Sequence, residues 1–494
     1  MILKQRLKEI APDTNQGRTF LKIAGVLVGL AVVCHLIMGA GLASVLLCSV
    51  AVLLSLLPLA YFGPLNIAAV LIALVGFRYI GFPLFAKLAM GQALDLYLLD
   101  PTGAFGVVLV GVLGYGIAVL ISSKLPLGRP LLAPVSSHAA LGRISFLAAA
   151  VGITANIAVA FRAGEIYTGI TVASFFTPFL HLALIAAVAR VLVASDRKRS
   201  MDVWTIVILI FEIIFGMVRN SRMPLMETVL CFVVTVSTFE YKIRWRQFVI
   251  IATSIAVIVV FITPVFLYVR NFRGELSWTQ RIEATIDAFA DWPDAFSFFL
   301  ENRDLRMRNG WFLNYYGSPQ NVFERMSHVN HVDVLKAGTD SRGKVGLQDL
   351  TDGVERAVPR VLAPNKPRDY STGAWLYYHI GVSNVMGGYA TAALIGNGYA
   401  AFGWMGAFFY PGILGLLWLV VVRKISGFDL RGNIWAIYLL LRIHNQFVEG
   451  SSSAYLLYVF RSLPQDFILL WLIKILGEGR FLSSCPQKRI SKLW

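Results

Sequence analysis

The chain is a succession of apolar runs, most of them about 20 residues long, separated by short polar or basic stretches. The runs lie at residues 21–38, 41–61, 64–86, 104–123, 143–161, 171–194, 203–218, 223–239, 247–268, 402–422, 433–450 and 454–477. A helix of about 20 apolar residues crosses a bilayer core of about 30 Å, and lipid admits only segments that satisfy their own backbone hydrogen bonds. We therefore predict an all-α polytopic membrane protein with about twelve transmembrane helices. The run at 203–218 is the weakest because it is short and contains Glu212.

Composition supports this class and excludes others. Hydrophobic residues make up 57% of the chain, charged residues only 15%, and the mean hydropathy is +0.67. A soluble domain carries about 25% charged residues. The four cysteines form no CxxC pattern and no disulfide framework. Much of the formal net charge of +16 falls in short stretches between apolar runs, which is typical of membrane topology and not of a nucleic-acid-binding face.

The basic stretches also predict the orientation. A cytoplasmic N-terminus places the stretches at 124–143, 190–199, 242–246, 423–431 and 474–492 in the cytoplasm as well. The predicted order is a cytoplasmic segment (1–20), nine transmembrane helices (21–268), a large periplasmic loop with a re-entrant or amphipathic end (269–401), three helices (402–477) and a basic cytoplasmic tail (478–494). No internal repeat of the kind that many transporters show is visible.

The large loop is rich in arginine. Eleven arginines and three lysines lie between residues 270 and 368. The planar guanidinium group suits bidentate binding of phosphate or carboxylate. The alternative for any one of these arginines is a surface ion pair with a neighbouring acidic residue, such as Glu301 or Asp352.

Arginines next to the predicted membrane surface are the stronger candidates, because a charge there needs a partner. The candidate ligands of a diphosphate group are Arg219, Arg222, Arg270, Arg273, Arg356, Arg360, Lys366 and Arg368. Snorkelling to the interface is the alternative for the first two. Three prolines between residues 359 and 367 hold the last group in an extended, rigid segment.

Glu355, Asp369 and His379 lie near these cations in the sequence and are candidates for a general base. Two further groups of polar residues stand out. Arg442, His444, Gln446 and Glu449 lie within one predicted helix, where they are either functional or joined by an internal Arg442–Glu449 ion pair. His328, His331 and Asp333 have a spacing that a metal site can use, but no HExxH or CxxC motif accompanies them, so no metal or other cofactor is predicted.

Two segments resemble a known family. The sequence from Val358 to Pro367 is similar to a proline, arginine and lysine-proline pattern, and Ile395 to Gly406 is similar to a small-residue, tyrosine and phenylalanine-glycine pattern, which includes Tyr399. In the Wzy-type oligosaccharide repeat-unit polymerases of bacterial inner membranes, the first pattern occurs late in the outer loop and the second at the entry to the next transmembrane helix. Ser221-Arg222 is similar to a further motif of that family. Asn397 departs from it, because the family commonly has an acidic residue there.

The resemblance implies a metal-independent membrane glycosyltransferase of GT-C-like architecture that makes O-antigen or exopolysaccharide. Its substrate is an undecaprenyl-diphosphate-linked glycan, and its partners include the bilayer and, by the same resemblance, a chain-length regulator and a flippase. Arg356, Arg360, Glu355 and His379 are then the catalytic candidates, and Tyr399 a binding residue. An O-antigen ligase and a lipid-linked glycan flippase or transporter remain the alternative interpretations.

Overall fold

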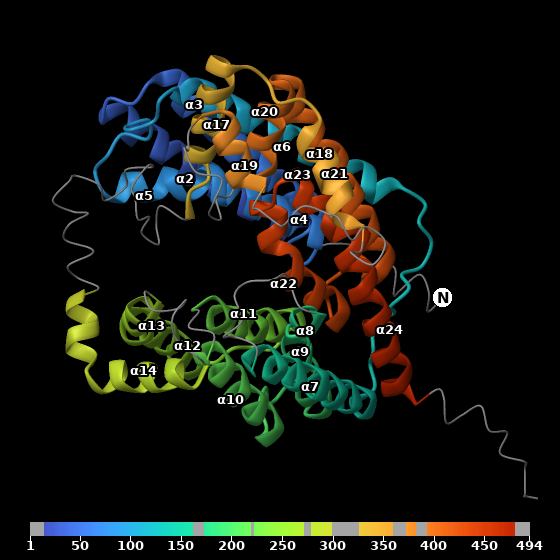
Figure 1. The fold of residues 1–494 in the computed structure, drawn as a ribbon. Coiled ribbons are helices and arrows are strands. Elements are labelled where there is room, and N and C mark those ends of the chain that lie inside the picture. The colour runs from blue at the N-terminus through green and yellow to red at the C-terminus, as the bar shows by residue number, and fades with distance from the viewer. Residues whose placement is uncertain are drawn as a thin grey trace, which may run out of the picture. The chain divides into compact units, whose positions relative to one another are not determined.

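The computed structural model describes residues 14–161, 172–218, 222–270, 278–298, 326–358, 372–381 and 393–479. These residues fold into helices, and no strand forms among them (Figure 1). Eight helical segments of the described chain are long and apolar enough to cross a membrane. They are Gly17–Ile37, Leu42–Phe62, Ile67–Ala89, Pro101–Lys124, His138–Val159, Trp245–Phe266, Trp404–Ser426 and Ser452–Glu478. Three shorter apolar helices are Phe179–Ala194, Val203–Gly216 and Leu225–Thr238. The prediction of a helical membrane protein is confirmed at this level.

The chain divides into two compact units. Unit 1 comprises residues 1–130, 305–429 and 443–464. Its helices are α2 (Thr14–Ile37), α3 (Leu42–Phe62), α4 (Ile67–Gly76), α5 (Phe82–Ala89), α6 (Pro101–Lys124), α17 (Val329–Arg342), α18 (Gln348–Ala357), α19 (Thr372–His379), α20 (Leu394–Phe402), α21 (Trp404–Ser426) and α23 (Ser452–Leu457). Two π-helical turns, η1 (Phe77–Gly81) and η3 (Tyr458–Ser462), continue α4 and α23.

Glycines let the helices of unit 1 approach closely. Gly403 has a φ of +66° and turns the chain from α20 into α21. A Cβ on Gly398 would lie 2.3 Å from the carbonyl oxygen of Gly406, and a Cβ on Gly114 would lie 2.3 Å from that of Phe408. Such spacing leaves no room for any side chain, so the small-residue motif at 395–406 is a packing motif between α20 and α21.

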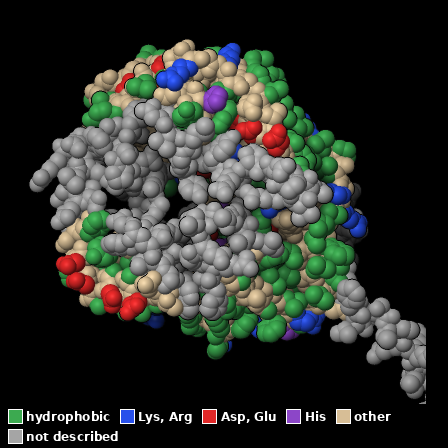
Figure 2. Space-filling view, viewed as in Figure 1, with side chains coloured by type: hydrophobic (Ala, Val, Ile, Leu, Met, Phe, Trp, Pro, Cys, Tyr) green, Lys and Arg blue, Asp and Glu red, His purple; other side chains and the backbone are tan. Residues whose placement is uncertain are grey.

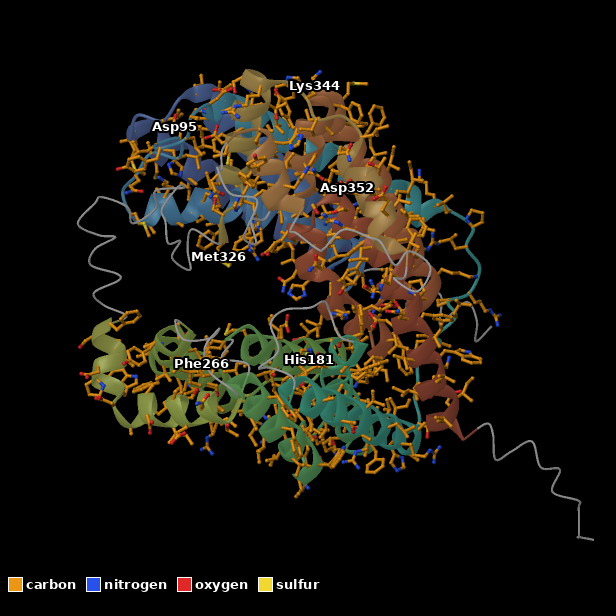
Figure 3. All side chains as sticks on the ribbon, in the orientation of Figure 1. Asp95, His181, Phe266, Met326, Lys344 and Asp352 are labelled. Atoms are coloured by element: carbon orange, nitrogen blue, oxygen red, sulfur yellow. The ribbon has the colours of Figure 1, made fainter. Side chains whose placement is uncertain are left out.

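Helix α17 comes from the segment predicted to be an outer loop, yet it is packed into unit 1. The Asp333 carboxylate accepts hydrogen bonds from the backbone N–H groups of Leu99 and Asp100, at 2.6 and 2.9 Å. One turn further along, Lys336 Nζ lies 2.8 Å from the Asp100 carboxylate. Both contacts fix α17 beside the first turn of α6. Met326 precedes α17 and Lys344 follows it, and the two residues lie well apart (Figure 3).

Unit 2 comprises residues 131–304, 430–442 and 465–494. Its helices are α7 (His138–Phe161), α8 (Val172–Phe176), α9 (Phe179–Ala194), α10 (Val203–Val218), α11 (Arg222–Thr238), α12 (Trp245–Val257), η2 (Ile258–Ile262), α13 (Thr263–Arg270) and α14 (Trp278–Ala290). Most of α22 (Ile434–Glu449) and of α24 (Leu463–Glu478) also belongs to it.

The surface of α10 shows why this helix suits a membrane. Ile206, Ile210 and Ile213 are 45–50% exposed and recur at helical spacing, whereas Glu212 is only 4% exposed. Exposed hydrophobic side chains lie over much of the described surface of both units (Figure 2). Exposed apolar side chains carry no free-energy penalty in lipid, and burial inside the protein keeps the Glu212 carboxylate out of the hydrocarbon. Glu212 made the run at 203–218 the weakest of the predicted transmembrane helices, but its side chain faces the protein interior.

Candidate functional site

Most of the predicted diphosphate ligands are not placed. Arg219, Arg273, Arg360, Lys366 and Arg368 lie outside the described residues, as does Asp369. Arg222 begins α11 and Arg270 ends α13, but their side chains are also outside the description. The predicted cationic cradle therefore stays a prediction.

The remaining candidates lie in unit 1. In α18, Glu355 is exposed and Arg356 is partly buried. His379 is exposed at the end of α19, where its ring stacks on Trp375 with the centroids 4.5 Å apart.

Tyr399 is only 5% exposed, and its hydroxyl donates to Asp340 at 2.8 Å. The ammonium group of Lys336 lies 5.9 Å from the Tyr399 ring centroid. These contacts tie α20 to α17, so the structure gives this tyrosine a packing role.

A second buried carboxylate lies beside the motif that carries the resemblance. Asp349, on α18, is fully buried, and the Ser452 hydroxyl donates a hydrogen bond to it. The Asn397 Oδ1 atom accepts the backbone N–H of Ser452 at 2.8 Å. Burial raises the pKa of Asp349 to about 6, against the opposing effects of Ser452, Asn397 and Arg356. Asn397 of α20 and Asp349 of α18 are therefore both hydrogen-bonded to Ser452.

In unit 1, a loop helix and a transmembrane segment bring charged and polar side chains together in a group that we call the Arg78 cluster (Arg78, His328, His331, Tyr377 and Glu449). The Arg78 guanidinium donates to the Glu449 carboxylate and to His328 Nε2, the latter at 2.9 Å. His328 Nε2 also lies 3.6 Å from the Glu449 carboxylate. A guanidinium holds its protons at all working pH values, so His328 accepts at Nε2 and carries its own proton on Nδ1.

Local structure explains how these groups meet. Arg78 lies in the π-helical turn η1, in the middle of the segment Ile67–Ala89, and its backbone carbonyl accepts the N–H of His328 at 3.0 Å. The wider turn of a π-helix frees backbone groups for outside partners, and such turns are frequent at functional sites. His328 precedes Lys336 by eight residues, about 12 Å of helix. Helix α17 therefore reaches from the end of α6 to the middle of a neighbouring transmembrane segment.

Desolvation disfavours the protonated form of both histidines of the cluster. Desolvation on burial lowers the pKa of His328, although the hydrogen bond to Glu449 opposes this shift. Burial, then the nearby His328, lowers the pKa of His331 to about 3. His331 Nδ1 is hydrogen-bonded to the Tyr377 hydroxyl at 2.7 Å, while His328 Nδ1 has no partner among the described residues. Glu449 keeps 35% of its side chain exposed, so a substrate hydroxyl has access to it.

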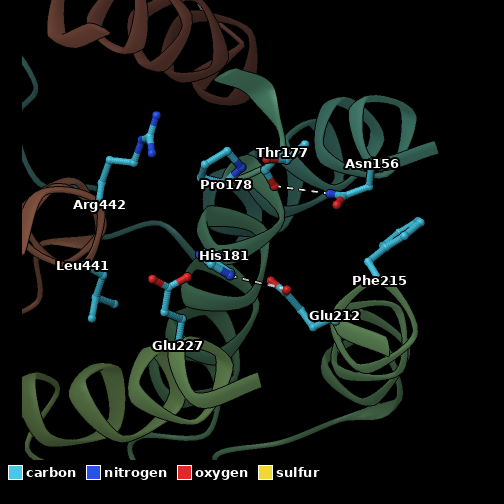
Figure 4. A pocket seen from close by; sticks show the side chains of 10 residues that line it. Asn156, Thr177, Pro178, His181, Glu212, Phe215, Glu227, Leu441 and Arg442 are labelled. Atoms are coloured by element: carbon cyan, nitrogen blue, oxygen red, sulfur yellow. Dashed lines mark hydrogen bonds and ion pairs between the residues drawn. The ribbon is translucent and has the colours of Figure 1, made fainter. Parts of the chain in front are cut away.

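Unit 2 contains a cavity of about 220 Å³, which we call the acidic cavity. Its lining residues are Asn156, Thr177, Pro178, His181, Glu212, Phe215, Gly216, Glu227, Leu441 and Arg442. His181 Nε2 lies 3.4 Å from one oxygen of Glu212, and the Glu227 carboxylate is directed toward the same imidazole (Figure 4). The other oxygen of Glu212 has no hydrogen-bond partner among the described residues.

Of the two alternatives for the polar residues of α22, the internal Arg442–Glu449 ion pair is wrong. Arg442 Nε lies 3.3 Å from the Asp466 carboxylate of α24, and Glu449 is bound to Arg78 instead. Seven residues separate Arg442 from Glu449, which is about 10 Å along a helix and too far for direct contact. The two residues also belong to different units.

Sequence reasoning missed Arg78, His181 and Glu227 as site residues, although each is an ionisable group inside an apolar run. An ionisable residue inside an apolar run rarely faces lipid, so this feature alone would have identified all three residues as candidates. His328 and His331 were considered only as metal ligands. No group of three candidate metal ligands occurs in the described part of the chain, and Asp333 is occupied with the backbone of residues 99 and 100.

Fold and sites together define a polytopic helical membrane protein with ionisable groups inside its helical units. A family described as a domain of unknown function, DUF8712, matches residues 144–476, and the chain belongs to this family. No curated protein and no solved structure matches the chain.

Proposed function

We propose that the protein polymerises undecaprenyl-diphosphate-linked oligosaccharide repeat units into O-antigen or exopolysaccharide at the outer face of a bacterial inner membrane. One observation carries the proposal beyond the sequence resemblance. In the Arg78 cluster, a helix of the predicted outer loop meets a transmembrane arginine and a partly exposed carboxylate. Twelve spans, with both termini in the cytoplasm, belong to the same proposal.

The chemistry requires a base and a cation. The acceptor sugar hydroxyl attacks the anomeric carbon of the donor, the bond from that carbon to the diphosphate oxygen breaks, and the hydroxyl proton passes to a base. Glu449 serves as that base, and Arg78 holds its carboxylate in place. The undecaprenyl diphosphate leaves with the negative charge, which preorganised guanidinium groups stabilise.

The predicted cradle supplies those further guanidinium groups. Arg219, Arg222, Arg270, Arg273, Arg356 and Arg360, with Lys366 and Arg368, are the proposed diphosphate ligands. His379 and Glu355 are exposed and therefore accessible to substrate, which is consistent with the roles that the resemblance implies. No step of this mechanism requires a metal.

A second function, transport of a lipid-linked glycan, is favoured by the acidic cavity. Ionisable side chains buried among membrane helices mark substrate and ion pathways. The two functions differ in what accumulates when the protein is missing. A missing polymerase leaves single lipid-linked repeats on the outer face, a missing ligase leaves lipid-linked polymer there, and a missing transporter leaves its cargo in the cytoplasmic leaflet.

The test is gel analysis of surface and lipid-linked glycans from a deletion strain complemented with variants. Wild type restores long chains, whereas Glu449→Gln and Arg360→Ala leave single outward-facing repeats. Arg197→Ala and Glu240→Gln are matched controls, because these residues form an ion pair that is 57% and 58% exposed. Normal chain lengths with both Glu449→Gln and Arg360→Ala, or repeats trapped inside the cell, contradict the proposal.

A further inference from the structure

A pocket that we call the basic pocket lies in unit 2, where α11 ends and α10 and α12 begin. Its volume is about 340 Å³, and its lining residues are Lys198, Arg199, Ser200, Met201, Phe232, Tyr241, Ile243, Arg244, Gln247 and Ile250. Ligand sites in proteins commonly measure about 300–1,000 Å³. The link between α9 and α10 and the link between α11 and α12 therefore meet around a space large enough for a small ligand or a headgroup.

The basic pocket carries three positive charges and no negative charge. Lys198, Arg199 and Arg244 line it, and the lining contains no aspartate or glutamate. In the described part of the chain, no ion pair joins any of these three cations to an acidic residue. Three like charges around one space repel one another, so an anion that binds between them relieves the repulsion.

The acidic residues next to the pocket do not neutralise it. Glu240 lies 2.6 Å from Arg197, and Asp202 is paired with Arg190, so both carboxylates are engaged with arginines outside the lining. Asp196 is exposed and also lies outside the lining. The three cations of the pocket therefore remain available to an anionic ligand.

The ends of the apolar helices place the pocket at a membrane surface. Helix α12 begins the candidate span Trp245–Phe266, and the apolar segment Leu225–Thr238 ends shortly before it. Trp245 is 74% exposed, and its ring stacks on Phe248 with the centroids 5.4 Å apart. Exposed aromatic rings at a helix end are typical of the boundary between headgroups and hydrocarbon. The anion that reaches this pocket most readily is therefore a lipid headgroup.

The lining also has an apolar side. Met201, Ile243 and Ile250 line the pocket and are 37–63% exposed. Lysine and arginine bind phosphate oxygens, whereas exposed aliphatic side chains bind acyl chains. Cations and apolar side chains in one pocket thus match the two ends of a phospholipid, and a free anion uses only the first of them.

We propose that the basic pocket binds one anionic phospholipid, with Lys198, Arg199 and Arg244 on its phosphate group and the acyl chains along the apolar side of the lining. Basic pockets at the ends of membrane helices are a recurrent form of lipid-headgroup recognition. The site lies in unit 2, separate from the Arg78 cluster, and the proposal does not depend on the polymerase function.

Topology alone also places basic residues at the ends of membrane helices. Lys242 and Arg246 are of this kind, since both are exposed and neither lines the pocket. They lie within two residues of Arg244 in the sequence. The chain therefore provides a matched comparison, in which one lysine and one arginine are neutralised either inside the pocket or beside it.

The test is native mass spectrometry of the purified full-length protein in a neutral detergent, titrated with phosphatidylglycerol or with phosphatidylcholine of the same acyl chains. Wild type is expected to bind one phosphatidylglycerol more tightly than phosphatidylcholine. A basic residue beside an anionic headgroup contributes about fivefold in affinity, so Lys198→Gln with Arg244→Gln should weaken phosphatidylglycerol binding about 25-fold. Lys242→Gln with Arg246→Gln removes the same charge outside the pocket and should change the affinity by less than about twofold at about 0.15 M salt.

If the double pocket variant does not fold, the single changes Arg244→Gln and Arg246→Gln make the same comparison. Equal affinity for the two lipids, or an equal loss in the pocket variant and its control, overturns the proposal, because the charges then act only through topology or diffuse attraction. Displacement of phosphatidylglycerol by inorganic phosphate alone would identify a free anion as the ligand and also overturn it. None of these results bears on glycan polymerisation.

Discussion

The two units differ in how their buried carboxylates are paired. In the Arg78 cluster, one guanidinium is shared by a carboxylate and a neutral imidazole, so the charges balance. In the acidic cavity, Glu212 and Glu227 line the same space, and one oxygen of Glu212 lacks a partner among the described residues. In the Arg78 cluster the carboxylate is paired within the cluster, which suits a base that must be held in position.

Removing the central cation is expected to have the largest effect. Arg78→Leu leaves the Glu449 carboxylate without its partner and should lower the free energy of unfolding by about 3 kcal/mol. This is the low end for a broken buried pair, since Glu449 is 35% exposed. Thermal unfolding in detergent measures the loss. The double variant Arg78→Leu with Glu449→Leu should recover most of it, and failure of that recovery argues against charge balance as the cause.

The buried carboxylate of α18 tests whether unit 1 tolerates an unbalanced charge. Because the pKa of Asp349 is raised to about 6, its ionised form destabilises the fold above that pH. The raised pKa favours folding at low pH, and this advantage disappears as the pH rises from about 4 to 6. Asp349→Asn should therefore stabilise the protein at pH 8 by at most about 3 kcal/mol, and have no effect at pH 4. Unfolding temperatures at both pH values check the sign.

The histidines predict sensitivity to acid. The pKa of His331 is lowered to about 3, so below pH 6.5 the unfolded chain binds a proton that the folded chain does not. Stability present above pH 6.5 should fall by about 2 kcal/mol at pH 5. His331→Gln should reduce that loss between pH 7.5 and 5, measured by thermal unfolding. An unchanged pH profile would mean that His331 is protonated in the folded protein.

The smallest effect is expected at the acidic cavity. Glu212→Gln removes a buried carboxylate, one oxygen of which has no partner among the described residues, and should raise the free energy of unfolding by about 1 kcal/mol. Thermal unfolding in detergent measures the change, and destabilisation would instead show that His181 already balances Glu212. Glu240→Gln, at the exposed pair with Arg197, should change stability by less than about 1 kcal/mol.

Apolar runs predict the helices of this chain well, because hydrocarbon imposes the same length and hydrogen-bonding rule on each of them. A helix lies in each of the twelve predicted runs, although one is broken at Thr177–Pro178. The site was harder to predict. Arg78 and His328 are 250 residues apart, and nothing local in the sequence reports that α17 packs beside α6. A charge in an apolar run identifies a candidate, but its partner depends on tertiary packing.

The most direct test is an assay of the purified protein with a defined lipid-linked repeat unit in detergent or liposomes. We expect wild type and Glu240→Gln to form polymer at equal rates, and Glu449→Gln to lose at least about 100-fold in rate while it retains its fold, since a positioned base contributes about 10²–10⁴-fold. Polymer formation by Glu449→Gln at the wild-type rate would contradict the role of the Arg78 cluster. Absence of polymer with wild type, across several repeat units, would contradict the proposed function itself.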